Sequence, residues 1–160
     1  MLKLKNAGLS VGRNFIFQRG CIIDPAFCFL ITIGNNVTLA PNVHILAHDA
    51  SIKRHLNCSK IGLVEIGDNT FLGASTIVLP GVKIGKNCIV GAGSVVTKNI
   101  PEGTVVAGSP ARKIGSTIKY LQKHKRALKT RPVYENDWLI GKNKKRKIKK
   151  SLRDGIGYAP

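Results

Sequence analysis

The chain has 160 residues and a formal net charge of +18, with 26 Lys or Arg residues against 8 Asp or Glu residues. A chain of this length is expected to form one domain, and no apolar run approaches the roughly 18 residues that a membrane-spanning helix needs. The N-terminus lacks the basic-then-apolar layout of a signal peptide, so we expect a cytoplasmic protein. The four cysteines have no CxxC spacing and are expected to be reduced thiols.

A period of six residues begins near the N-terminus. It places four apolar residues in one column: Val11, Phe17, Ile23 and Phe29. The period slips after this stretch and resumes at Ile33. Residues 1–10 are expected to cover the open end of the structure with their few apolar side chains. A short fixed period is typical of a repeat architecture.

The period stops between Asp49 and Leu63, and complete hexapeptides flank this segment on both sides. A stack of repeats accommodates such an insertion, about residues 49–63, as a loop extruded from one corner. Loops on a rigid scaffold often carry function. His48, where the segment begins, is therefore a candidate functional residue.

The clearest repeats run without interruption from Ile66 to Pro101. The first column is aliphatic in all six hexapeptides: Ile66, Leu72, Val78, Ile84, Val90 and Val96. The second column is glycine in four of them: Gly67, Gly73, Gly85 and Gly91. The fifth column holds small or β-branched residues: Thr70, Thr76, Val82, Cys88, Ser94 and Ile100.

A strict period of six fits neither an isolated helix nor a simple strand. A helix places apolar residues three and four positions apart, and a half-buried strand alternates. Hexapeptides of this kind predict an all-β fold, a parallel β-helix in which each repeat makes one short strand and a turn. The first-column residue is expected to point inward, the glycine to take the tight backbone conformation, and the fifth residue to fill the narrow interior.

Beyond Pro110 the composition changes, and four apolar residues have helical spacing: Ile114, Ile118, Leu121 and Leu128. This spacing predicts an amphipathic helix over about 116–130, lying against the end of the repeat stack. We therefore divide the chain into a β-helix domain at 1–110 and a C-terminal helix with a basic tail at 111–160.

The positive charge is concentrated in the second segment. Residues 1–110 carry a net charge of +5, from 10 Lys or Arg and 5 Asp or Glu, whereas residues 111–160 carry +13, from 16 and 3. Apolar patches at 138–140 and 156–158 are expected to be docking points. The lysine run at 142–150 is compatible with a helix or with a mobile segment.

Two motifs carry a resemblance to a known family: LAPNVHILAHD at 39–49, and GAGSVVTKNIP followed by AGSPAR within 91–112. Over about residues 9–115 the sequence resembles the hexapeptide-repeat acetyltransferases, in particular the sugar O-acetyltransferases that act on maltose, galactosides, nodulation factors and bacterial surface polysaccharides. The resemblance implies a left-handed parallel β-helix, an exception to the usual right-handed crossover. It also implies a homotrimer with active sites between subunits and the acetyl-CoA co-substrate along the cleft.

The resemblance further implies the roles of individual residues. His48 matches the family's catalytic base. The positions that contact the coenzyme match five residues of this chain: Ala74, Ala92, Thr97, Lys98 and Arg112. On the acceptor side, an acceptor-binding Asn of the galactoside enzymes is replaced in this chain around Gln18, and Asp24 corresponds to an acidic acceptor residue. The chain has His48-Asp49 where the sugar enzymes usually have His-Pro, so the acceptor is less defined than the acyl donor.

The spacing of two alanines supports the coenzyme site independently. Three hexapeptides make one triangular coil of 18 residues, so Ala74 and Ala92 are expected to stack at one corner of successive coils. Small residues there leave peptide groups accessible to the amides of a pantetheine arm, although Gly and Ala also simply suit a turn. Lys98, Arg112 and Lys113 follow this row and are expected to meet the phosphates of coenzyme A.

Acyl transfer to a hydroxyl needs a base, and histidine is the side chain best matched to this role near neutral pH. Three other histidines are weaker candidates, because His44 is expected to pack at a strand edge, His55 to lie in the extruded loop and His124 to be solvated. Asp24 has three possible roles: it binds an acceptor hydroxyl, orients the base or caps the turn before Pro25.

These patterns predict an acetyl-CoA-dependent O-acetyltransferase for a sugar hydroxyl in surface glycan synthesis. Serine, amino-sugar and antibiotic acceptors remain alternatives, as does a non-catalytic basic module. A related solenoid holds zinc in γ-class carbonic anhydrases, but the histidines here lack the required spacing, so no metal is expected. The tail could be a solubilising segment, or it could bind an anionic membrane surface at the inner face of the membrane. Specific nucleic-acid binding is not expected, because stacking aromatics are scarce.

Overall fold

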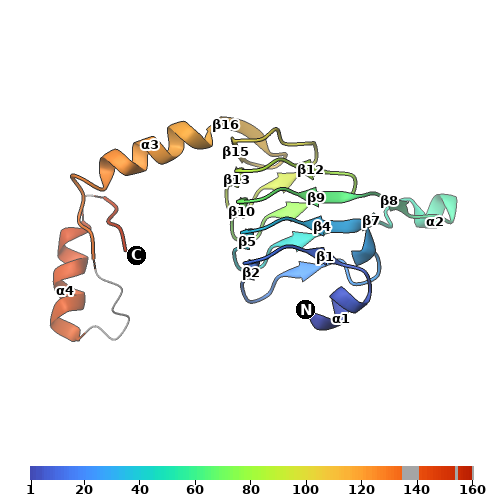
Figure 1. Cartoon of the computed structure of the whole chain (residues 1–160), viewed down its shortest axis with the longest axis horizontal. Coiled ribbons are helices and arrows are strands. Elements are labelled where there is room, and N and C mark those ends of the chain that lie inside the picture. The colour runs from blue at the N-terminus through green and yellow to red at the C-terminus, as the bar shows by residue number, and fades with distance from the viewer. Residues whose placement is uncertain (135–140, 154, 160) are drawn as a thin grey trace. The chain divides into compact units, whose positions relative to one another are not determined.

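Short parallel strands stack in three sheets that together form a β-helix (Figure 1). In the computed structural model, residues 1–134, 141–153 and 155–159 are described. Sheet A contains β1 (Ser10–Val11), β4 (Ile31–Ile33), β9 (Val64–Ile66) and β12 (Lys83–Ile84). Sheet B contains β2 (Ile16–Phe17), β5 (Thr38–Leu39), β10 (Phe71–Leu72), β13 (Ile89–Val90), β15 (Thr104–Ala107) and β16 (Arg112–Ser116). Sheet C contains β3 (Ile22–Ile23), β6 (His44–Ile45), β11 (Ile77–Val78) and β14 (Val95–Val96).

The pairing register confirms the 18-residue coil. Leu72 of β10 pairs with Val90 of β13, and Val78 of β11 pairs with Val96 of β14, all in parallel. The chain visits sheets A, B and C in turn, so each coil has three corners, which we name the A–B, B–C and C–A corners after the sheets that they join. Among the described strands of these three sheets, only β16 breaks the pattern, because it turns back and pairs antiparallel with β15.

The interior contains the predicted columns of the repeat. All six first-column residues from Ile66 to Val96 are at most 2% exposed, and the fifth-column residues from Thr70 to Ile100 are at most 6% exposed. At the N-terminal end, helix α1 (Leu2–Asn6) precedes Leu9, and Leu4 and Leu9 pack with the core. The burial of these apolar side chains supplies the main favourable free energy of the coil.

Two predicted inward residues are exposed instead, so that prediction was wrong for them. Phe17 is 46% exposed and Phe29 is 58% exposed. Phe17 lies on β2, the edge strand of sheet B, and no further coil covers it. Phe29 lies in the short 3-10 helix η1 (Cys28–Leu30), where the period slips and the chain rotates the side chain outward.

We expected the second-column glycines to take the tight backbone conformation, and this prediction was wrong. Left-handed φ angles occur in the fourth column instead, for example at Asn69 (φ 56°) and Asn87 (φ 55°). The second-column glycines are needed because adjacent coils come very close. A Cβ built on Gly67 would lie 2.6 Å from the backbone nitrogen of Lys86 in the next coil.

The fourth-column asparagines also form a ladder along the A–B corner. Asn14 donates to Asn36 (3.0 Å), Asn36 to Asn69 (2.9 Å), and Asn69 to Asn87 (3.2 Å). Each step joins one coil to the next. Asparagine therefore serves two purposes here, since it tolerates the left-handed conformation and links the coils through its amide.

Residues 49–63 leave the coil at the C–A corner (Figure 1). Strands β7 (His48–Asp49) and β8 (Lys60–Ile61) pair antiparallel as the stem, and α2 (Lys53–Leu56) lies between them. An ion pair between Lys60 and Asp49 (2.5 Å) spans the stem. The chain returns to the corner at Gly62, whose N–H donates to the carbonyl of Ala47 (3.0 Å).

The chain divides into two compact units, Met1–Thr117 and Ile118–Pro160. The first extends past Pro110 because β16 belongs to sheet B. Helix α3 (Thr117–Ala127) begins at the division, and the lysine run is helical in α4 (Lys142–Ser151).

Tyr158 holds the second unit together. It donates a backbone hydrogen bond to Pro132 (2.9 Å), and its hydroxyl bonds to Nδ1 of His124 (2.8 Å). The prediction that His124 is merely solvated was therefore wrong, because its ring also packs against Tyr120. The predicted docking patch at 138–140 lies outside the described residues.

Close coil stacking predicts a strong effect of a single methyl group at position 67. Gly67→Ala should destabilise the protein by about 1–3 kcal/mol, because the Cβ must displace the backbone of the next coil. Gly115→Ala is the matched control, since nothing lies within 4 Å of a Cβ built there. Urea unfolding of both variants measures the difference, and equal midpoints would contradict the stacking argument.

Candidate active site

Seven of the residues singled out by the sequence lie at two corners of the coil, and Arg112 lies on β16 of sheet B. His48, Asp24, Thr97 and Lys98 follow strands of sheet C and lie at the C–A corner. Three others follow strands of sheet B and lie at the B–C corner: Gln18, Ala74 and Ala92. Sheet C separates the two groups within one chain. Secondary structure thus places the histidine and the alanine row on opposite edges of one face.

His48 is held by a buried carboxylate. Its Nδ1 hydrogen bonds to Oδ2 of Asp24, and its backbone N–H donates to the same oxygen (3.1 Å). The Ala47 N–H donates to that oxygen as well (3.0 Å). The side chain of Asp24 is fully buried, whereas that of His48 is 35% exposed. The imidazole is therefore partly open to solvent, whereas the carboxylate is not.

The charge of Asp24 decides which ring nitrogen is basic. Burial raises the pKa of this carboxyl. Hydrogen bonds from His48 and from the backbone N–H groups of Ala47, Phe27 and Ala26 lower the pKa, and together they outweigh burial. The pKa of Asp24 therefore lies below the usual 3.8. The group is therefore a carboxylate at neutral pH. Because a carboxylate only accepts, Nδ1 of His48 carries the proton and Nε2 is free to act as a base.

An aromatic ring next to the histidine was missed by sequence reasoning. Phe27 packs against His48 with ring centroids 4.9 Å apart and an interplanar angle of 38°. It follows Asp24 in the connection 24–30, which is longer than the connection 79–82 at the same corner, and this departure from the period is the signal that could have found it. Phe27 limits the orientations open to the imidazole.

The B–C corner presents little side-chain bulk, as predicted. Gly93 donates from its backbone to the carbonyl of Ala74 (2.8 Å), which joins the two turns of successive coils. A Cβ on Gly73 would lie 2.5 Å from the backbone nitrogen of Ala92. Ala92 and Gly93 are exposed, and Ala74 is partly exposed. The corner therefore offers accessible peptide groups in a row parallel to the coil axis.

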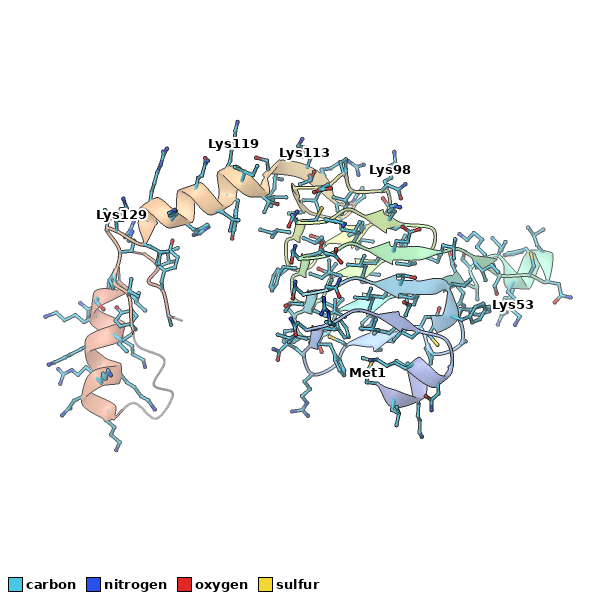
Figure 2. All side chains as sticks on the ribbon, viewed as in Figure 1. Met1, Lys53, Lys98, Lys113, Lys119 and Lys129 are labelled. Carbon is cyan, nitrogen blue, oxygen red and sulfur yellow. The ribbon has the colours of Figure 1, made fainter. Side chains whose placement is uncertain are left out.

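Three cations gather at the C-terminal end of the coil. Lys98, Arg112 and Lys113 line one depression of about 300 Å³ together with Thr104 and Ala111. Figure 2 shows Lys98 and Lys113 projecting from this last part of the coil. A cluster of lysine and arginine at a concave surface suits a phosphorylated ligand. Arg112 reaches this place because β16 turns back along β15.

Two kinds of feature are not found in the described parts of the chain. No three or more His, Cys, Asp or Glu side chains converge there in a group that could hold a metal ion. None of the helices described is long and apolar enough to cross a membrane.

The repeat identified above matches a family model described as the hexapeptide repeat of succinyl-transferase, over residues 63–98. Protein CapG of Staphylococcus aureus is 42% identical over 129 residues, which cover 76% of this chain and 73% of CapG. The chain belongs to the hexapeptide-repeat acetyltransferase family. It spans 50%, 58% and 54% of the length of three further curated relatives that are named as acetyltransferases.

Solved structures of this acetyltransferase family have the same fold. A maltose O-acetyltransferase from Clostridium difficile 630 is 42% identical with a TM-score of 0.60, over 68% of this chain and 59% of that one. The hexapeptide-repeat acetyltransferase VCA0836 of Vibrio cholerae, solved in complex with acetyl coenzyme A, is 25% identical with a TM-score of 0.60, over 69% of this chain and 61% of that one.

The lowered pKa of Asp24 predicts how stability depends on pH. Asp24→Asn should lower the free energy of unfolding at pH 6 by roughly 2–4 kcal/mol, because the buried N–H groups and His48 lose a charged acceptor. A carboxyl with a folded pKa below 3.8 contributes its full stability above pH 3.8 and loses it as the pH falls further. The difference in the free energy of unfolding between the parent chain and Asp24→Asn should therefore be smaller at pH 3 than at pH 6.

Asp49→Asn is the control for this experiment. Hydrogen bonds from Lys60 and Ser51 lower the pKa of Asp49 to about 2, but this group is partly exposed on the stem of the extruded segment. Its substitution should change the urea midpoint far less at either pH. If the difference in unfolding free energy between the parent chain and Asp24→Asn stays constant or grows on acidification, the assigned charge state of Asp24 is wrong.

Proposed function

We propose that the protein is an acetyl-CoA-dependent O-acetyltransferase acting on a sugar hydroxyl in surface glycan synthesis. The observation that carries this proposal is the pair formed by Asp24 and His48, in which the carboxylate takes Nδ1 and leaves Nε2 as the basic nitrogen of a partly exposed histidine. The sugar acceptor is supported by the maltose O-acetyltransferase among the similar structures.

The left-handed sense of the coil, which the resemblance implies, remains a prediction.

In the proposed reaction His48 acts as the general base. Nε2 takes the proton of the acceptor hydroxyl as its oxygen attacks the thioester carbon of acetyl-CoA. The C–S bond then breaks, and the imidazolium returns the proton to the leaving thiolate. Asp24 orients the ring and stabilises its charged form. With its side chain fully buried, Asp24 is better suited to this role than to direct binding of an acceptor.

The coenzyme would lie along the B–C corner. Accessible peptide groups at Ala74 and Ala92 can pair with the amides of the pantetheine arm, because no long side chain covers them. The phosphates would meet the depression lined by Lys98, Arg112 and Lys113, and Thr97 lies directly before the first of these. Gln18 lies at the N-terminal end of the B–C corner, where an acceptor group is expected.

We further propose that each active site is completed by two chains of a homotrimer. His48 and the alanine row lie on opposite edges of sheet C, so a coenzyme bound along the row of one chain would not bring its thioester to the base of that same chain. A neighbouring copy would bring its B–C corner to the C–A corner of the first. Closed cyclic symmetry repeats this contact three times.

The basic second unit suggests a place of action. The described part of α4 displays lysine and arginine on all sides, with only Ile148 and Leu152 as partly covered apolar residues in and next to it. Each Lys or Arg near an anionic leaflet contributes about 1 kcal/mol. We propose that this helix holds the cytoplasmic enzyme at the inner face of the membrane, near lipid-linked acceptors.

The central test is thiol release from acetyl-CoA. The parent chain should release coenzyme A in the presence of pyranosides, and His48→Ala should lower kcat by about 10²–10⁴-fold, which is the usual contribution of a general base. His44→Ala is the matched control, because this half-buried histidine lies on β6 in sheet C. An unchanged rate in His48→Ala would remove the proposed base, and serine and antibiotics in the same assay would detect a different acceptor.

Mixing two inactive variants tests the shared site. His48→Ala removes the base, and Ala92→Trp blocks the coenzyme corner while leaving the core intact, because Ala92 is exposed. If each site takes its base from one chain and its coenzyme corner from another, equal co-expression should make about one quarter of the sites intact. A site is intact only when the first chain carries Ala92→Trp and the second carries His48→Ala, and each has a chance of about one half. Sites built within one chain would regain no activity on mixing.

Vesicle sedimentation tests the membrane proposal. The full chain should pellet with vesicles that contain phosphatidylserine, less so at high salt because screening weakens the attraction. Deletion of residues 142–160 should abolish pelleting. Neutral phosphatidylcholine vesicles are the control, and equal pelleting of the full and shortened chains would contradict the proposal.

A further inference from the structure

Phe27 and Phe29 form an aromatic pair next to His48, and the acetyl transfer described above gives this pair no role. The ring of Phe27 packs against the imidazole with a centroid distance of 4.9 Å, and the centroids of the Phe27 and Phe29 rings are 6.1 Å apart at an interplanar angle of 40°. Phe29 is 58% exposed. An aromatic surface therefore extends from the base outward into solvent.

The chain departs from its repeat to build this pair. Residues 24–30 connect β3 to β4 at the C–A corner, whereas the corresponding connection from β11 to β12 takes only residues 79–82. The extra residues contain both rings. The longer connection thus places two aromatic side chains at the corner that carries the histidine.

The pair is firmly positioned by its neighbours. Oδ1 of Asp24 accepts hydrogen bonds from the N–H groups of Ala26 (3.1 Å) and Phe27 (3.2 Å), while its other oxygen holds His48. Cys28, between the two aromatic residues, is 1% exposed. Its thiol bonds to the carbonyls of Leu4 (3.6 Å) and Ala7 (3.5 Å). One carboxylate and one buried cysteine therefore fix the base and the aromatic pair in a common frame.

We propose that Phe29, supported by Phe27, is the platform on which the pyranose ring of the acceptor stacks. The C–H groups on one face of a pyranose carry partial positive charge and pack against the negative face of an aromatic ring. The hydroxyls at the edge of such a sugar stay free, and one of them can reach Nε2 of His48. This inference rests on the proposed sugar O-acetyltransferase function and names the part of the site that selects a cyclic acceptor.

The order of residues along the C–A corner favours the acceptor over the coenzyme as the occupant. The aromatic pair belongs to the first coil, His48 to the second, and Lys98 to the last. The cations that suit the coenzyme phosphates thus lie on the C-terminal side of the base. The aromatic pair lies on its N-terminal side, where the second substrate of a transfer reaction must approach.

Kinetics with a cyclic and an acyclic acceptor test the platform. Phe29→Ala should raise the KM for methyl β-galactoside and for maltose by about 3- to 10-fold, as expected for the loss of one stacking contact. The KM for acetyl-CoA and the rate with glycerol, which has no ring face, should not change. Phe29→Trp should retain the low KM, because it keeps an aromatic face.

Phe71→Ala is the matched control, since Phe71 is 43% exposed on β10 in sheet B, on another face of the coil. A parent chain that acetylates pyranosides while Phe29→Ala keeps the parent KM would overturn the platform and leave the transferase standing. An equal rise in KM for glycerol would also overturn it, because that result indicates general damage to the corner.

Saturation-transfer NMR on His48→Ala provides a second readout without catalysis. Methyl β-galactoside should receive saturation from the protein, and the additional change Phe29→Ala should reduce that signal. If no pyranoside binds in this experiment and none is acetylated by the parent chain, both the platform and the proposed sugar acceptor are wrong. Binding that is insensitive to Phe29 would contradict the platform alone.

Discussion

The close stacking of one coil on the next is the constraint on which the rest of this structure depends. Successive coils are in register at 18 residues, so that Leu72 lies against Val90 and Val78 against Val96. At this spacing the corners admit only glycine where a Cβ would meet the adjacent backbone, as at Gly67. The same rigidity lets a side chain at one corner keep a fixed relation to residues far away in the sequence.

Asp24 converts this scaffold into a chemical site. Its buried carboxylate holds Nδ1 of His48, the backbone of Ala47 and the turn that contains Phe27. Hydrogen bonds from these groups outweigh the cost of burial and lower the pKa of the carboxyl, so the charge persists where an isolated carboxylate would be expensive. A single acidic residue thus sets the tautomer of the proposed base and the position of the aromatic ring beside it.

Charge and apolar surface are distributed along the coil in a way that suits two substrates. The cations Lys98, Arg112 and Lys113 share one depression near the C-terminal end of the coil, and the aromatic pair lies near its N-terminal end. His48 lies between them in the order of the coils. A phosphorylated donor and a cyclic acceptor would then approach the base from opposite directions.

The amino-acid sequence by itself determined the repeat, its inward columns and the histidine at the start of the extruded segment. These features are periodic or local, and a period of six repeats the same environment wherever the coils are complete. Thr70, Cys88 and Val96 are buried where the period predicts. The resemblance of residues 39–49 to known enzymes could also be read from short motifs.

Only the tertiary structure decided the arrangement of the site. The contact of Asp24 with His48 joins residues 24 positions apart, and it depends on an irregular corner that no period describes. Phe29 faces outward for the same reason. His48 is separated from Ala74 and Ala92 because it follows a strand of sheet C, whereas the two alanines follow strands of sheet B. The assignment of strands to sheets is a property of the folded coil. Side chains at irregular corners are placed by contacts between coils, which sequence spacing does not encode.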